Sequence, residues 1–133
     1  LVSRRFVDVV GPMREDYFLY CEEVEWCLRA LNGGLRLGFA ADAKVFHRQG
    51  ATTGASGDAH KVAKLPLYLT MRNTILLTRD RTPRWTPVAG IALLAVLVRR
   101  FALRGAWRQF GHGFIGLVAG MRNERGAPQW LTI

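Results

Sequence analysis

The chain has 133 residues, of which 50% are hydrophobic and 22% are charged, and its formal net charge is +9. This composition excludes an intrinsically disordered chain, and the length fits one small domain or part of a larger one. The charge is uneven: residues 1–60 hold 7 basic and 8 acidic side chains, whereas residues 61–133 hold 12 and 2.

The first 60 residues mix strand patterns with one helix pattern. Residues 2–10 alternate loosely between polar and apolar side chains and predict a strand that ends at a Gly-Pro turn. Apolar residues at three- and four-residue steps predict a helix over residues 21–31. Two shorter alternating segments, residues 35–39 and 44–47, predict further short strands.

The second half has helical patterns. Residues 60–78 predict one helix, and a second begins near Thr86-Pro87 with an apolar run over residues 88–98. That run of 11 residues is shorter than the roughly 20 that a spanning helix needs. It is therefore interpreted as a core helix or as a helix lying in a membrane interface, and the aromatic and arginine residues that flank it suit an anionic lipid surface.

Three carboxylates lie within four positions at the start of the first predicted helix: Glu22, Glu23 and Glu25. Acidic residues in a first turn stabilise a helix through its dipole. Neighbouring carboxylates also raise one another's pKa, so one of the three could act as a general base on a sugar hydroxyl. The residues alone leave both interpretations open.

Two cationic side chains are further candidates. His47 lies at the end of a predicted strand and could ligate a metal ion or contact a diphosphate, or be an ordinary polar residue. Arg72, which follows Tyr68 in a predicted helix, could bind a phosphate or carboxylate, or pair on the surface.

Taken in order, the segment Tyr20-Cys21-Glu22-Glu23-Val24-Glu25, then His47, then Arg72-Asn73 resembles the C-terminal part of the catalytic domain of family 2 inverting glycosyltransferases, of the rhamnosyltransferase-like type. The resemblance implies an α/β fold, the C-terminal part of a GT-A-like domain followed by a mostly helical tail. Residues 1–80 would form the acceptor side of the catalytic domain. Residues 81–133 would form a basic, apolar helical region.

The resemblance also implies roles for single residues. Glu23 occupies the position of the catalytic base, and Glu22, Glu25, Tyr20 and Arg72 would support the acceptor site. His47 would contact a metal ion or the diphosphate. The family's Glu-Asp-x-Asp is Glu-Glu-x-Glu in this chain, and the extra methylene matters because catalytic geometry is sensitive to about 1 Å.

The implied ligands are a UDP- or dTDP-sugar donor, a divalent metal (Mg or Mn) and a glycan or polyprenyl-linked acceptor, at the cytoplasmic face of the plasma membrane. No Asp-x-Asp sequence occurs in the chain, so the donor-binding half is expected to be absent and the isolated chain inactive. The alternative is a non-catalytic basic module that binds a membrane surface or another partner. No motif for nucleic-acid binding occurs, so nucleic acid is not expected as a partner.

Overall fold

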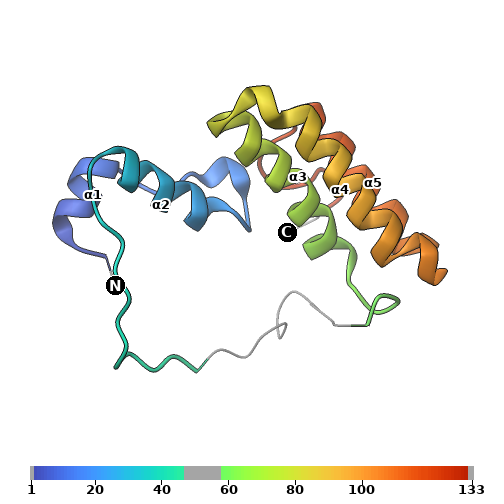
Figure 1. Cartoon of the computed structure of the whole chain (residues 1–133), viewed down its shortest axis with the longest axis horizontal. Helices are drawn as coiled ribbons and strands as arrows, with labels where there is room; N and C mark the ends of the chain where they lie inside the picture. Colours follow the sequence, from blue (N-terminus) through green and yellow to red (C-terminus); the bar gives the residue numbers. More distant parts are fainter. Residues whose placement is uncertain (1, 47–57, 132–133) are drawn as a thin grey trace. The chain divides into compact units, whose positions relative to one another are not determined.

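The computed structural model describes residues 2–46 and 58–131. The chain divides into two compact units, the first made of Leu1–His47 with Gly126–Ile133 and the second of Arg48–Arg125. All regular elements in the described ranges are helical (Figure 1). The α-helices are α1 (Arg4–Val10), α2 (Glu22–Asn32), α3 (Lys64–Arg81), α4 (Thr86–Arg100) and α5 (Trp107–Met121), and the 3-10 turns are Glu15–Tyr17, Pro83–Trp85 and Ala102–Arg104.

The predicted α/β, GT-A-like fold is wrong, because the described parts of the chain contain helices and no strand. Residues 35–39 and 44–46 have no regular structure, and residue 47 lies outside the described ranges. A strand is stable only when neighbouring strands satisfy its backbone groups and its apolar face is covered. Neither condition is met in these segments: Phe39 and Phe46 are 94% and 99% exposed.

The segment predicted as the first strand is instead α1, and its helical signals are local. The Ser3 hydroxyl accepts a hydrogen bond from the Phe6 backbone N–H at 3.2 Å, which caps the helix. Arg4 pairs with Asp8 one turn later at 3.0 Å. Gly11 ends the helix with φ +75°, a conformation that favours glycine.

The predicted helix over residues 21–31 is confirmed as α2, with bounds shifted by one residue. The rings of Phe6 and Trp26 join α1 to α2 edge-to-face, with centroids 4.7 Å apart. The Trp26 indole N–H also donates to the Gly11 carbonyl at 2.8 Å. Through these two contacts, Trp26 holds α2 against α1 and against Gly11 at the end of α1.

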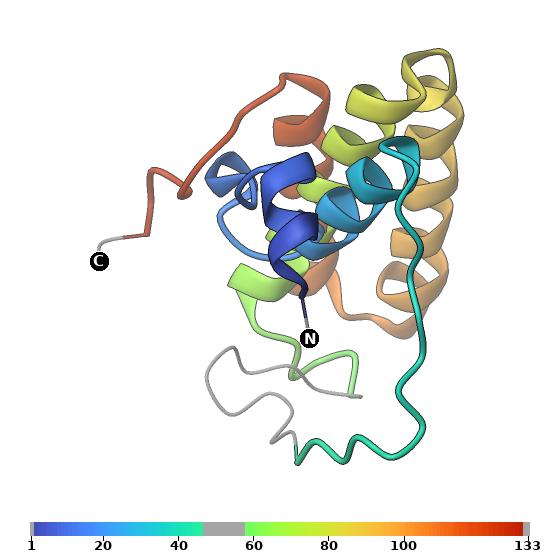
Figure 2. The ribbon, with the colours of Figure 1, turned by 90° about the vertical axis from the view of Figure 1, so that its left-hand side faces the viewer.

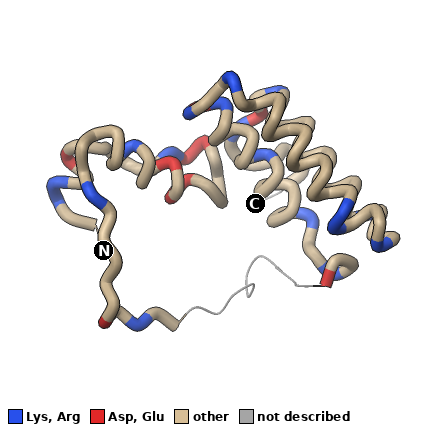
Figure 3. Tube along the Cα trace, in the orientation of Figure 1, with Lys and Arg blue, Asp and Glu red and all other residues tan. Residues whose placement is uncertain are grey.

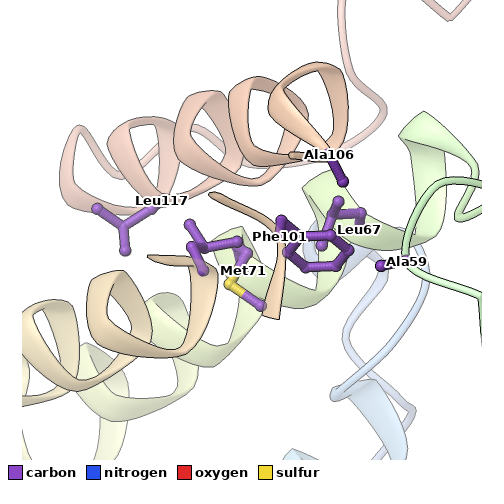
Figure 4. Packing of buried hydrophobic residues seen from close by; sticks show 7 residues of the cluster. Ala59, Leu67, Met71, Phe101, Ala106 and Leu117 are labelled. Atoms are coloured by element: carbon purple, nitrogen blue, oxygen red, sulfur yellow. The ribbon is translucent and has the colours of Figure 1, made fainter. Parts of the chain in front are cut away.

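The second unit is a bundle in which α3, α4 and α5 lie side by side, as Figures 1 and 2 both show. Its core includes a hydrophobic cluster to which all three helices contribute (Figure 4). Leu97 and Phe101 are almost fully buried at its centre. The cluster comprises Ala59, Leu67, Met71, Leu97, Phe101, Ala106 and Leu117.

Close packing of α5 depends on three glycines that face the other two helices. A Cβ at Gly116 would lie 2.3 Å from the Tyr68 carbonyl oxygen, and one at Gly120 would lie 2.7 Å from the Arg72 carbonyl oxygen. A Cβ at Gly113 would lie 2.3 Å from a methyl group of Leu97. The glycines therefore allow α5 to approach the backbone of α3 more closely than any side chain would permit.

The apolar run predicted at residues 88–98 lies inside a longer helical stretch than the sequence indicated. In the described part of the chain, one stretch, Pro83–Arg104, is long and apolar enough to cross a bilayer by length and composition alone. It has 22 residues, and 17% of its most apolar window is buried. The buried core helix of a soluble protein can be equally long and apolar, so the exposure of this helix is more informative than its length.

Candidate functional site

The backbone before α2 is strained at three non-glycine residues. Phe18, Tyr20 and Cys21 have φ values of 69°, 68° and 70°. Phe18 is the centre of a tight γ-turn, in which the Leu19 N–H donates to the Tyr17 carbonyl at 3.0 Å. Positive φ at such residues costs on the order of 1 kcal/mol each and gathers at functional sites. No pattern of residues in the sequence predicts this turn. Tyr20 is half-buried in it, two positions before the first of the acidic residues.

Glu25 has a structural role in the arrangement observed. Its carboxylate is 2% exposed and accepts a hydrogen bond from Arg29 Nε at 2.9 Å. The same guanidinium donates to the Val10 carbonyl at 2.6 Å and to the Pro12 carbonyl at 2.7 Å. Glu25 and Arg29 therefore join α2 to the segment that links it to α1.

Glu22 and Glu23 lie at the first turn of α2 in different environments. Glu23 is exposed, whereas Glu22 is partly buried. Burial raises the pKa of Glu22 above its usual value, and the negative charge and hydrogen bond of Glu23 raise it further, although a backbone hydrogen bond opposes the shift. One carboxylate oxygen of Glu22, Oε2, is buried and has no hydrogen-bond partner among the described residues. The pair thus combines an accessible carboxylate with a neighbour that holds its proton to higher pH.

A divalent metal site does not fit the residues that surround this acidic turn. Within residues 2–46 and 58–131, no three His, Cys, Asp or Glu side chains gather in a way that could hold a metal ion. The carboxylate of Glu25 is already engaged by Arg29. The predicted metal or diphosphate ligand, His47, lies outside the described residues. Proton transfer is one chemistry that the carboxylates of the acidic turn can support.

Arg72 is a buried residue of α3 and belongs to the second unit, whereas the acidic turn belongs to the first. Its guanidinium donates to Asn73 Oδ1 at 2.9 Å and lies 5.6 Å from the centre of the Tyr68 ring. Burial lowers its pKa, with smaller opposing contributions from Tyr68. Because only 1% of Arg72 is exposed, the interpretation as a surface ion pair is wrong. Arg72 is thus part of the interior of the bundle and not of the turn that carries the carboxylates.

Comparison with known proteins found no matching family model and no matching solved structure. The chain is 32% identical over 83 residues to the dTDP-rhamnosyl transferase RfbF of Shigella flexneri, which covers 59% of this chain and 27% of that protein. It is 21% identical over 134 residues to the low-salt glycan biosynthesis hexosyltransferase Agl10 of Haloferax volcanii, which covers 97% of this chain and 42% of that protein.

Both curated relatives carry the name of a sugar-transferring enzyme, and the chain spans less than half the length of each. The similarity therefore supports a connection with glycosyl transfer at a general level. It agrees with the resemblance inferred from the acidic turn, although identity is low.

Proposed function

We propose that this chain is the acceptor-side part of a family 2 inverting glycosyltransferase. Its donor would be a UDP- or dTDP-activated sugar, and its acceptor a glycan or polyprenyl-linked glycan. The observation that carries the proposal is the accessible carboxylate of Glu23 in the first turn of α2, beside Glu22, whose pKa is raised by burial. The names of the two relatives support the same class of reaction.

In this mechanism Glu23 accepts the proton of an acceptor hydroxyl while the hydroxyl oxygen attacks the anomeric carbon of the donor. The new glycosidic bond forms on the face opposite the nucleoside diphosphate, whose bond to the anomeric carbon breaks, so the configuration inverts. The hydroxyl proton ends on Glu23 and the bonding electrons leave with the diphosphate.

The position of Glu23 in the first turn of α2 also supports its proposed role as the base. The Glu25–Arg29 pair and the strained residues before α2 hold this helix start in place. A general base must lie within hydrogen-bond reach of the proton that it removes. A carboxylate on a fixed helix end meets that requirement better than one on an unconstrained loop.

The test is a transfer assay on the native gene product that contains this chain. We expect Glu23→Gln to lower kcat by about 100-fold to 10,000-fold, the range for loss of a general base. Circular dichroism should remain unchanged, because Glu23 is exposed. The matched control is Glu15→Gln, which removes another exposed carboxylate of the same unit. Unchanged transfer by the Glu23→Gln protein would overturn the assignment of the base.

A non-catalytic membrane-surface module is the second candidate function, and one observation favours it. Apolar residues of α4 such as Val88, Ile91 and Val98 are exposed, which no step of sugar transfer requires. If the native gene product transfers no sugar from UDP- or dTDP-donors but binds vesicles, this function replaces the first.

A further inference from the structure

The apolar side chains of α4 face away from the protein core. Thr86 and Leu97 are its only buried residues. On the opposite side, at helical spacing, Val88, Ile91 and Val98 are 52%, 72% and 38% exposed. A surface helix in water normally shows the reverse arrangement, with apolar residues inward and polar residues outward. We call this outward side the outer face of α4; its exposed apolar residues also include Ala92, Leu94, Ala95 and Val96.

Aromatic and basic side chains border the outer face. Trp85 precedes α4 and Trp107 begins α5, and both are more than half exposed. Residues 83–108 contain five arginines and no acidic residue, and Figure 3 shows the stretch of α4 between its charged ends free of charged residues. Exposed tryptophans with arginines around an apolar surface are typical of the boundary between lipid headgroups and acyl chains.

A hollow at the C-terminal end of α4 combines both properties. It has a volume of 580 Å³ and is lined by Ala95, Val96, Arg99, Arg100 and Arg104. Arginine binds phosphate through several N–H groups, while the small apolar residues can contact an acyl chain. The chemistry of this hollow matches the headgroup and upper acyl chain of an anionic phospholipid.

We propose that the outer face of α4 lies in the surface of an anionic lipid bilayer, with the hollow at its C-terminal end occupied by lipid phosphates. Charge argues for lipid over a second copy of this chain, because two outer faces would bring their arginines together without any acidic partner. Anionic lipid supplies the opposite charge and the apolar contact at once.

The helix lies along the bilayer surface and does not cross it. The other side of α4 packs on α3 and α5, and the middle of α3 carries the buried polar pair Arg72 and Asn73. A crossing orientation would carry Arg72 and Asn73 into hydrocarbon, where polar and charged side chains are costly. An orientation in the surface plane buries only the outer face of α4.

The experiment measures partition of the full chain into vesicles. The chain is mixed with vesicles of phosphatidylcholine alone or with about 30% phosphatidylglycerol, at about 0.1 M and about 1 M salt. We expect binding to the anionic vesicles that weakens with salt and little binding to the neutral ones. Absence of binding to anionic vesicles at low salt would overturn the proposal.

Two variants separate the apolar and the charged contributions. Ile91→Ser should weaken partition about tenfold, because the side chain no longer enters the acyl region. Arg99→Gln, Arg100→Gln and Arg104→Gln together should weaken it about 100-fold, since each basic residue contributes about a fivefold factor. Circular dichroism checks that each variant folds; the substituted side chains are all exposed. Unchanged partition of either folded variant would overturn the proposed contacts.

Controls come from the first unit, where Leu37 is 51% exposed and Arg36 is also exposed. Leu37→Ser makes the same change as Ile91→Ser away from α4, and Arg36→Gln removes one arginine charge, which on the outer face is expected to cost about fivefold; both controls should leave partition unchanged. An equal loss in the controls would show that overall hydrophobicity and charge, and not the outer face of α4, determine the binding.

Spin labels then distinguish the two orientations. Cysteines introduced by Val88→Cys or Val98→Cys, in a chain carrying Cys21→Ser and Cys27→Ser, place a nitroxide at either end of the outer face. The two positions are ten residues apart, about 15 Å along the helix. Similar immersion depths support the surface orientation, whereas depths that differ by about 15 Å would overturn it. None of these measurements uses a sugar donor, so their failure is distinct from failure of the proposed transfer.

Discussion

Replacing Gly116 by alanine tests whether α5 packs on α3 through direct backbone contact. The added Cβ would lie 2.3 Å from the Tyr68 carbonyl oxygen and 2.9 Å from its carbonyl carbon. Carbon–oxygen contacts settle at about 3.3 Å or more, so the helices must separate by roughly 1 Å. The obstructing atoms belong to the backbone of α3, which cannot rotate away as a side chain can.

The size of the effect follows from two opposing contributions. Overpacking of this kind costs about 1–3 kcal/mol, and the higher helix propensity of alanine returns about 0.5–1 kcal/mol. We expect a net loss of about 1.5 kcal/mol in the free energy of unfolding. For a unit of this size, that loss lowers the melting temperature by roughly 10 °C.

Gly111 is the matched control on the same helix. A Cβ at Gly111 would meet nothing within 4 Å, so Gly111→Ala should gain the propensity contribution of about 0.5–1 kcal/mol without any clash. Thermal and urea unfolding followed by circular dichroism should therefore shift in opposite directions for the two variants. If Gly116→Ala stabilises the protein as much as Gly111→Ala does, the proposed close approach of α3 and α5 is refuted.

Two further predictions concern the first unit. Arg29→Met removes the cation that pairs with the buried Glu25 carboxylate and should lower the free energy of unfolding, measured by urea titration, by about 3 kcal/mol. The control Arg36→Met should change this free energy little. Equal effects of the two substitutions would contradict the role of the Glu25–Arg29 pair. Glu22 has a raised pKa in the folded chain, so its contribution to stability is present below its unfolded pKa and is lost as pH rises through the folded value. Glu22→Gln should therefore make the protein more stable at pH 7 but not at pH 4, and an equal effect at both pH values would contradict the shift.

Helices with strong local signals could be predicted from the sequence, and segments with weaker patterns could not. The apolar spacing of α2 predicted its bounds to within one residue. Residues 2–10 contain α1 and not the predicted strand, because the Ser3 cap and the Arg4–Asp8 pair favour a helix and the alternation of polar and apolar residues is loose. Short alternating segments such as residues 35–39 carry no information about whether a partner strand exists.

In the candidate site, the positions of the acidic residues could be predicted from the sequence, but the surroundings of each side chain could not. The three carboxylates could be located from the sequence, but equal residues in one turn acquired different surroundings. Glu25 is paired with Arg29, Glu22 is partly buried, and Glu23 is exposed. Helix geometry determines which positions share a face of α2. The burial of these side chains depends also on the turn before α2, and no residue type in the sequence predicts the positive φ values of that turn. The role of Glu23 as the base stays a prediction.

The apolar run of α4 had two interpretations that composition could not separate, since core helices and interfacial helices use the same residues. In the structure Leu97 is buried while Ile91 is exposed, and this exposure supports the interfacial interpretation that we propose. Exposed apolar surface is unfavourable in water in proportion to its area, and the proposed lipid surface would cover it. The transfer proposal rests on α2 and the lipid proposal on α4, in different units. Loss of one activity without the other would therefore identify which proposal has failed.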